Sequence, residues 1–356
     1  MTSRDITDLR LVNQQLKGSA FTTPAELVSW MGCIQSQEFA GAKWAIGNRL
    51  SGIADAEIEN DFNAGKILRT HVLRPTWHFV SPRDIGWMLK LTAPKIKAMC
   101  KGIHKKLGID DVVLKRSKNI ITEALTGGRQ LTRSQLLPFF KNKQINTDDI
   151  RLGFLLMDAE LDGIVCSGAR QGKQFTYALM EERVLNPMQM GKDAALAELA
   201  KKYFLSRGPA TLQDFSWWSG LNLTESKKAL EMNKSLLVNE VVNGMAYWFS
   251  PAVTPVKSLV PVNLLPSFDE YAIAYKDRAD ILLPQFSQQT GNGIFKPIIL
   301  IDGQIQGTWT RSFHKENVHL EVSVLNPAIK FSKQAMLSAA KNYADFLGME
   351  LTLLVK

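Results

Sequence analysis

The sequence predicts an α+β protein made of three tandem winged-helix units and a C-terminal α+β domain with an antiparallel β-hairpin. Two observations lead to this fold class. Helices followed by two short β-rich runs occur three times in series, and the last hundred residues carry more strand patterns than the rest. We expect the units at 1–108, 109–190 and 191–254, and the C-terminal domain at 255–356.

The first unit begins with a clear helix start. Thr23 is a typical N-cap, Pro24 takes the first helical position, and Glu26 completes a capping box. A second helix, DAEIENDFNAG, ends at Gly65, and the segment 67–80 is rich in Val, Thr, Trp and Phe. This composition predicts a strand pair after two helices.

The next two units repeat this order. Helices are expected in VVLKRSKNIITEALTGG, in LTRSQLLPFF after Thr132 and in TDDIRLGFLLMDAELDG, followed by a wing, IVCSGARQGKQFTYAL, with a basic, glycine-containing tip. The third unit has DAALAELAKKYFLSRG, TLQDFSWWSG and TESKKALEMNKS before a hairpin at Asn243-Gly244.

The C-terminal domain follows a linker marked by Pro251, Pro255 and Pro261. Asp302-Gly303 joins two β-rich runs and predicts a hairpin. NVHLEVSVL is a further strand, and a helix from about Ala328 to Leu347 precedes a terminal strand, MELTLLV.

Composition limits the class of protein. The 356 residues are 45% hydrophobic and 22% charged, with a formal net charge of +9, which describes a globular chain with a basic surface. Nucleic acid is the first partner to expect, although basic globular proteins without a polyanionic partner are common. The three cysteines form no CxxC pair, and neither a leader nor a membrane span is apparent, so we expect a cytoplasmic protein.

Several cations are candidate DNA contacts. Lys227 and Lys228 lie on the third helix of the third unit, and Arg170 and Lys173 lie in the wing of the second. A basic run from Lys95 to Lys118 can also neutralise phosphates. Each of these groups can equally be the solvated face of a helix.

The common catalytic and metal-binding signatures are absent from the sequence. It has no GKS or GKT phosphate loop, no HExxH, no GxSxG and no metal-ligand spacing among its five histidines. We therefore expect neither a metal ion nor an organic cofactor.

Two amides, Gln35 and Gln37, remain as candidates for chemistry. They lie where the helical pattern after Pro24 fades, and they can converge only if the chain is extended or irregular there. Amides cannot remove a proton at neutral pH, but two of them can hold and orient one water molecule. This suffices only for a leaving group that departs readily, such as an N7-alkylated purine.

Several ordered blocks of the chain resemble the AlkZ-like DNA glycosylases, a winged-helix family of the AlkZ and YcaQ type. The matching segments are IQSQEFAGAKWAIGNRL, ILRTHVLRPTWHFVSPRDI, GPATLQDFSWWSGL, LLPSFDEYAIAYKDRADIL and NGIFKPIILIDGQIQGTWTR. The resemblance implies that Gln35 and Gln37 position the water that attacks the deoxyribose C1′. Ser36 departs from the family, which more often has an aliphatic residue between the two polar ones.

The resemblance also implies a cleft beside the two glutamines. Its expected lining residues are Ser36, Glu38, Thr76, Trp77 and His78, although His78 can equally be a core group bonded to a buried carbonyl. Glu38 is either an auxiliary carboxylate or a solvated side chain. The further expected DNA contacts are Arg69, Arg74 and Arg311. The charged residues of a block at 269–278 are explained equally well by ion pairs within the fold and by a functional role.

These observations favour a monofunctional, monomeric DNA glycosylase without cofactor or metal. Its substrate would be double-stranded DNA containing N7-alkylated purines, with unhooking of interstrand crosslinks as a further expectation. The alternative is a non-enzymatic winged-helix DNA-binding protein or regulator with structural glutamines. A family member that has lost excision activity is a third interpretation, to which Ser36 points.

Overall fold

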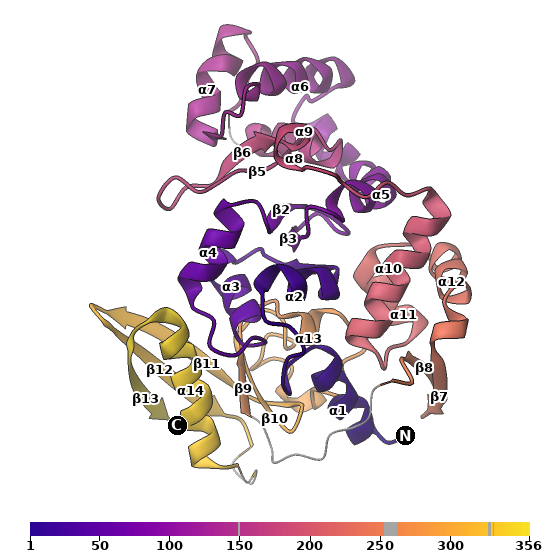
Figure 1. The fold of residues 1–356 in the computed structure, drawn as a ribbon, viewed down its shortest axis with the longest axis vertical. Coiled ribbons are helices and arrows are strands. Elements are labelled where there is room, and N and C mark those ends of the chain that lie inside the picture. The colour runs from indigo at the N-terminus through magenta and orange to yellow at the C-terminus, as the bar shows by residue number, and fades with distance from the viewer. Residues whose placement is uncertain (149, 253–261, 327–328, 330) are drawn as a thin grey trace. The chain divides into compact units, whose positions relative to one another are not determined.

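The computed structural model describes residues 1–148, 150–252, 262–326, 329 and 331–356 (Figure 1). The chain forms two compact units. The first unit consists of Met1–Glu59 and Leu196–Lys356, and the second unit, Asn60–Ala195, lies between these two segments in the sequence. Both contain helices and antiparallel strands, so the predicted mixed α+β class is confirmed, while the division into three winged-helix units stays a prediction.

The first unit begins with short capped helices. Thr2 and Thr23 each form a capping box, in which the threonine side chain accepts from the N–H three residues later and that residue's carboxylate accepts from the threonine N–H. Pro24 occupies the first turn of its helix as predicted. The helices of this unit are α1 (Ser3–Asn13), α2 (Pro24–Met31), α3 (Phe39–Gly47), α11 (Leu212–Ser219), α12 (Leu223–Glu231), α13 (Glu270–Ile273) and α14 (Lys333–Leu347), with 3-10 turns at Lys234–Leu236 and Pro284–Phe286. The helices α4 (Asp55–Asn63) and α10 (Lys192–Arg207) cross the boundaries of the units.

A five-stranded sheet forms the C-terminal part of the first unit. Its order is β13-β12-β11-β10-β9, and the strands are β9 (Val262–Leu265), β10 (Ile298–Ile301), β11 (Gln304–His314), β12 (Asn317–Val324) and β13 (Glu350–Val355). The predicted Asp302-Gly303 hairpin joins β10 to β11, because both residues adopt the positive φ that this turn requires. α14 packs against β9 and β13 (Figure 1).

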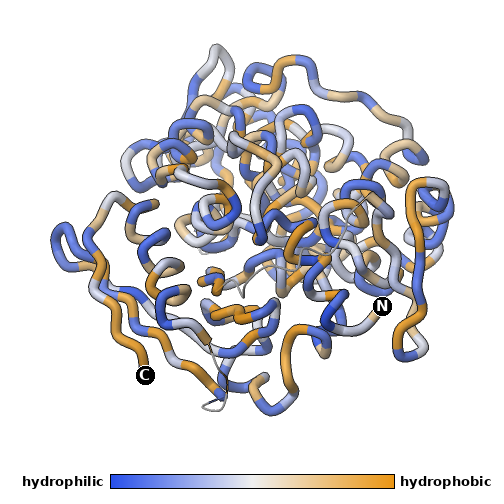
Figure 2. Tube along the Cα trace, turned by 60° about the horizontal axis from the view of Figure 1, so that its bottom comes forward, coloured by the Kyte–Doolittle hydropathy of each residue, from blue (hydrophilic) through white to orange (hydrophobic). Residues whose placement is uncertain are grey.

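The strand β13 pairs in parallel with β12 at one edge of this sheet. Parallel neighbours need a crossover, and α14 provides it between the two strands. Figure 2 shows this C-terminal strand mostly in the colour of hydrophobic residues. Leu351 and Leu353 are half-buried, whereas Leu354 and Val355 are exposed.

The second unit contains the strand pair that the sequence predicted for 164–179. Its strands β5 (Val165–Ser167) and β6 (Thr176–Leu179) pair antiparallel, and β4 (Leu131–Thr132) adds to β6 on the other side. A separate hairpin, β2 (Leu68–His71) and β3 (Trp77–Val80), confirms the strand pair predicted for 67–80. The helices are α5 (Ile85–Lys106), α6 (Asp111–Leu125), α7 (Arg133–Asn142), α8 (Arg151–Leu161) and α9 (Met180–Arg183). Apolar residues of α6, α7, α8 and β6 share one core.

Other predicted elements are confirmed with shifted ends. The Asn243-Gly244 turn joins β7 (Val238–Val242) to β8 (Met245–Phe249), and the terminal helix begins at Lys333. The predicted start of this helix near Ala328, the linker prolines Pro255 and Pro261, and the boundary between 254 and 255 lie outside the described residues. Within the described ranges, no helix is both long and apolar enough to span a bilayer.

Candidate active site

The segment with the two glutamines begins where α2 ends. Gly32 follows the last helical residue with a φ of 72°, a conformation that glycine adopts without strain, and the chain then enters β1 (Cys33–Gln35). α3 begins only at Phe39, so Gln35 and Gln37 lie in an extended and irregular stretch between two helices. The expectation that the helix has ended before Gln35 is therefore confirmed.

The residues of this stretch differ sharply in exposure. Gln35 is 8% exposed and Ser36 is fully buried, whereas Gln37 and Glu38 are exposed. Ser36 thus occupies an interior position, as the aliphatic residue of related chains is expected to do. The first glutamine is therefore held inside the protein, and the second, two residues later, is at its surface.

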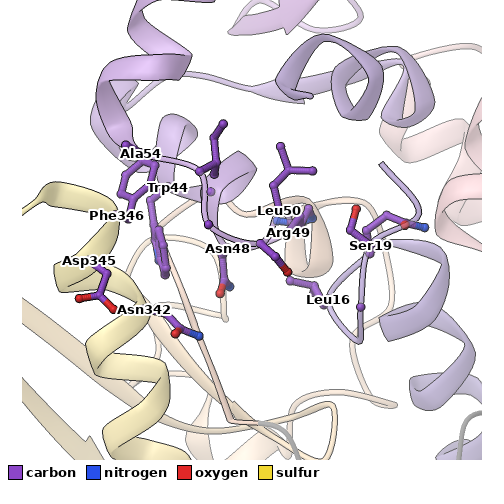
Figure 3. A pocket seen from close by; sticks show the side chains of 16 residues that line it. Leu16, Ser19, Trp44, Asn48, Arg49, Leu50, Ala54, Asn342, Asp345 and Phe346 are labelled. Carbon is purple, nitrogen blue, oxygen red and sulfur yellow. The ribbon is translucent and has the colours of Figure 1, made fainter. Parts of the chain in front are cut away.

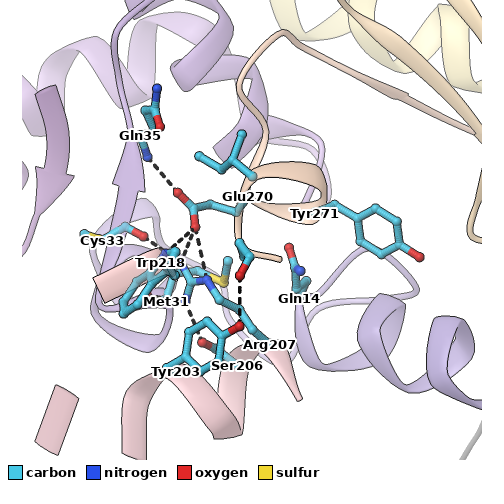
Figure 4. Close-up of polar contacts among 12 residues, drawn as sticks. Gln14, Met31, Cys33, Gln35, Tyr203, Ser206, Arg207, Trp218, Glu270 and Tyr271 are labelled. Atoms are coloured by element: carbon cyan, nitrogen blue, oxygen red, sulfur yellow. Dashed lines mark hydrogen bonds and ion pairs between the residues drawn. The ribbon is translucent and has the colours of Figure 1, made fainter. Parts of the chain in front are cut away.

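A buried carboxylate anchors the backbone of Gln35. Its N–H donates to Glu270 Oε1 at 2.9 Å, and Glu270 is fully buried at the start of α13 (Figure 4). The other carboxylate oxygen accepts hydrogen bonds from Arg207 and Trp218. These residues come from two segments distant in sequence, α10 to α11 and α13.

The exposed residue Glu38, directly after Gln37, contacts the five-stranded sheet. Glu38 caps α3 by accepting a hydrogen bond from the Gly41 N–H at 2.6 Å, and its Oε2 lies 3.4 Å from Arg311 Nη2 on β11. Arg311 donates a second hydrogen bond to the Tyr343 hydroxyl at 2.8 Å. The structure therefore brings two predicted site residues, Glu38 and Arg311, together directly after Gln37.

The second unit contains a cationic pocket around Arg69. The guanidinium carbon of Arg69 lies 4.3 Å from the ring centroid of Trp77 and 4.4 Å from that of Phe175, and the residue is 7% exposed. Burial lowers the pKa of Arg69 to about 10, Glu160 opposes this shift, and Arg133 adds to it. Arg69 nevertheless remains protonated at neutral pH.

The mouth of this pocket carries two further cations. The pocket measures about 300 Å³ and is lined by Arg69, Trp77, Arg133, Lys173, Gln174, Phe175 and Tyr177. Arg133 is exposed at the start of α7 and donates from Nε to the Tyr177 hydroxyl at 3.1 Å, while Lys173 is exposed at the wing tip. Cations beside aromatic walls suit a phosphate-bearing ligand.

The other predicted residues of the second unit have structural contacts. His78 is fully buried, and its Nδ1 lies 2.9 Å from the Thr76 carbonyl oxygen, which fits the core interpretation. Thr76, Trp77 and Arg74 are half-buried beside it. Arg170 lies 5.1 Å from the Phe175 ring, and its backbone N–H donates to the Asn63 side chain. The shared cleft between Thr76–His78 and the glutamines stays a prediction.

The remaining basic candidates divide into two groups. Lys227 and Lys228 are exposed on α12, as a DNA contact requires. Lys97 and Lys118, from the predicted basic run, form ion pairs with Asp158 and Asp162. These two lysines are therefore less available to phosphates than the run of charge suggested.

A cavity of about 320 Å³ in the first unit contains none of the predicted site residues (Figure 3). It lies between the end of α3 and α14 and is lined by Trp44 from α3 and by Asn342, Asp345 and Phe346 from α14. The Arg49 at its edge is held by Asp269 in a bidentate ion pair. The cavity is thus separate from the Gln35–Gln37 segment in sequence and in lining.

Sequence reasoning missed Arg133, Arg207 and the role of Glu270. The block at 269–278 was noted, and the ion pairs Arg49–Asp269 and Arg207–Glu270 explain its first two residues. Arg207 carried no usable signal, because its partners Met31 and Cys33 lie more than 170 residues away in the sequence. Arg133 is the first residue of a helix that was predicted correctly, but no sequence pattern marked it as a pocket residue.

Comparison with known proteins identifies the family and the fold. The family model described as "DNA glycosylase AlkZ-like" matches residues 28–346. The "Interstrand DNA cross-link repair glycosylase" of Streptomyces sahachiroi is 23% identical over 328 residues, which cover 86% of this chain and 87% of that relative. The solved structure of Streptomyces sahachiroi DNA glycosylase AlkZ matches with a TM-score of 0.83 at 20% identity, covering 100% of both chains.

The fold and the family match together define a DNA glycosylase, which confirms the predicted class of enzyme. The chain belongs to the AlkZ-like DNA glycosylase family.

Proposed function

We propose that this protein is a monofunctional DNA glycosylase that hydrolyses the N-glycosidic bond of N7-alkylated purines in duplex DNA and acts as a monomer. The observation that carries the proposal is the placement of Gln35 and Gln37. The first amide is buried on an anchored backbone, and the second is exposed two residues later. The resemblance of this segment to the family motif supports the assignment of both residues to the polar positions of that motif.

The chemistry requires only a positioned water molecule. An N7-alkylated purine carries a positive charge, so the electron pair of the C1′–N9 bond can leave with the base and neutralise it. The water oxygen then forms the new bond to C1′, and its proton passes to solvent. Gln35 and Gln37 orient this water through their amide donor and acceptor groups. Neither side chain needs to accept a proton.

DNA binding is proposed to involve both units. In the first unit, Arg311, Lys227 and Lys228 are exposed or partly exposed cations. In the second unit, the pocket of Arg69, Arg133 and Lys173 suits a backbone phosphate. We retain the three winged-helix units as the proposed framework for these contacts.

Crosslinked duplexes are a second proposed substrate. The relative from Streptomyces sahachiroi is named for repair of interstrand DNA cross-links. A crosslink through N7 of a purine carries the same activated leaving group as a simple adduct, so the same water attack would unhook it.

The test uses duplex DNA with a single N7-methylguanine and a matched duplex with a crosslink. Purified protein, Gln35→Ala and Gln37→Ala are incubated with each, and abasic sites are cleaved with alkali. We expect release of the base by the wild type and a loss of about 100-fold or more in either variant. Release no faster than in buffer on both substrates would contradict the glycosylase proposal and favour a non-enzymatic DNA-binding protein.

A further inference from the structure

The buried pair of Arg207 and Glu270 holds the chain that leads into Gln35. Arg207 donates from Nη2 to Glu270 Oε2 at 2.6 Å and from Nε at 3.0 Å. Trp218 Nε1 donates to the same oxygen at 3.0 Å. The side chains of Arg207 and Glu270 are 0% and 1% exposed, so both charges are removed from water and neutralised only inside the protein (Figure 4).

The same two side chains bind alternate backbone groups of one short segment. Arg207 donates from Nη1 to the Met31 carbonyl at 2.7 Å and from Nη2 to the Cys33 carbonyl at 2.8 Å, and Glu270 accepts from the Gln35 N–H at 2.9 Å. These contacts begin at the last residue of α2 and end at the first glutamine. They therefore fix the path of the chain through Gly32 and β1.

Arg207 is itself held rigidly. Its guanidinium carbon lies 4.4 Å from the Trp218 ring centroid, and Nη1 also donates to Ser206 Oγ at 2.7 Å. The Arg207 carbonyl accepts a hydrogen bond from the Tyr275 hydroxyl at 2.8 Å. A planar guanidinium with its donors occupied has little freedom to rotate, so it defines the positions of the groups that it binds.

Stability alone is a poor explanation of this arrangement. Buried ion pairs are often replaceable by apolar residues at little cost, and their best-attested role is to specify one geometry. Here the geometry is that of the backbone bearing Gln35, with Gln37 two residues further on. Misplacement of a positioning group by about 1 Å can slow a reaction by about 100-fold.

We propose that Arg207 and Glu270 are positioning residues that set the backbone of the Gln35–Gln37 segment for base release. This inference rests on the proposed function. Both side chains are buried, so they act through the segment and contribute to the rate of base release without contributing to DNA affinity.

The experiment compares Glu270→Gln and Arg207→Lys with a matched control, Arg49→Lys. Arg49 forms an equally buried ion pair with Asp269 in the same unit and donates to the Gln14 and Ala45 carbonyls, away from the segment. Single-turnover release of N7-methylguanine gives the maximal rate and the half-saturating protein concentration separately. Glu270→Gln retains the shape of the side chain, but its amide would direct a donor toward Arg207 or toward the Gln35 N–H.

We expect the maximal rate to fall about 10- to 100-fold in Glu270→Gln and Arg207→Lys, with half-saturation within about twofold of the wild type. Arg49→Lys should lose about as much thermal stability as the other two variants. Its folded protein should release the base at the wild-type rate. Equal rates in folded Glu270→Gln and the wild type would overturn the inference, and so would an equal loss in Arg49→Lys.

Amide hydrogen exchange and a milder variant keep the inference testable if the stronger variants fail to fold. Trp218→Phe removes the indole donor to Glu270 and retains an aromatic ring beside Arg207. We expect faster exchange at the Gln35 amide and a several-fold lower rate of base release, whereas unchanged exchange and rate would contradict the inference. If wild-type protein releases no base, the proposed function fails, while exchange at Gln35 in Glu270→Gln still decides whether Glu270 positions the segment.

Discussion

Arg311 Nη2 lies 3.4 Å from Glu38 Oε2, which joins the hairpin strand β11 to the residue directly after Gln37. Both side chains are partly exposed, so solvent screens their attraction. An arginine beside an exposed carboxylate can exchange that partner for a phosphate when DNA binds. The pair therefore links the candidate active site to a proposed DNA contact.

Arg311→Ala should weaken duplex binding and leave the protein folded. We expect a loss of about 1–2 kcal/mol in the free energy of unfolding, because the hydrogen bond to the Tyr343 hydroxyl is lost together with a weak, partly exposed ion pair. If Arg311 contacts a phosphate, the slope of log affinity against log salt should become shallower by about 1. Glu38→Gln is the matched change, because it removes the competing charge and should tighten binding. An unchanged affinity and slope in Arg311→Ala would exclude Arg311 as a contact.

Ser36→Ala should leave both folding and base release close to wild type. Ser36 is fully buried between the two glutamines, and alanine fits within the same volume. Ser36→Leu should instead destabilise the protein by about 1–3 kcal/mol, because extra methylene groups overpack a filled interior. Denaturant unfolding and single-turnover kinetics measure both effects. A tenfold slower reaction in Ser36→Ala would show that the hydroxyl takes part in positioning the water.

Arg133→Ala and Lys173→Ala should each reduce the salt dependence of DNA binding. Both residues line the pocket around Arg69, and each should contribute a slope of about 0.9 if it neutralises one phosphate. Affinity for an undamaged duplex, measured between low and moderate salt, tests this expectation. Lys341→Ala, an exposed change on α14, is the control. If the salt slopes of Arg133→Ala and Lys173→Ala equal that of Lys341→Ala, the duplex does not contact this pocket.

The ion pairs of Asp162 should make stability depend on pH at both extremes. Burial alone would raise the pKa of Asp162, but hydrogen bonds from Lys118 and Lys97 hold it below its ordinary value of 3.8. Burial opposes protonation of Lys118, yet hydrogen bonds to Asp158 and Asp162 raise its pKa above the ordinary 10.5.

The stabilisation is therefore present above about pH 4 and lost as pH falls through the folded-state pKa of Asp162. At the alkaline end it is present below about pH 10.5 and lost as pH rises through the folded-state pKa of Lys118. Urea unfolding of Asp162→Asn should show lower stability at pH 7 and a weaker loss on acidification than the wild type. Glu181→Gln, an exposed change on α9, should follow the wild-type curve. Parallel curves for Asp162→Asn and wild type would contradict this account.

Local patterns predicted most of the elements correctly. Thr23 with Pro24 and Thr132 as a cap predicted α2 and α7, because N-caps act within one helical turn, and in the structure Thr132 also forms a capping box with Gln135. Asp302-Gly303 and Asn243-Gly244 predicted two hairpins for the same local reason. The long helix α5 was not placed from the sequence, where its lysines were considered as part of a basic run and, alternatively, as the solvated face of a helix.

The sequence by itself determined the family, the α+β class and the short motif of Gln35, Ser36 and Gln37, since each depends on residue identity and near-neighbour spacing. Only the tertiary structure decided which groups surround that motif. Glu270 accepts a hydrogen bond from the Gln35 N–H, Arg207 binds the Met31 and Cys33 carbonyls just before the motif, and Trp218 binds Glu270. All three come from segments far beyond the motif in sequence, and burial forces their polar groups to find partners. Contacts between segments that are far apart in the sequence produce no local periodicity or motif spacing, so sequence patterns do not reveal them.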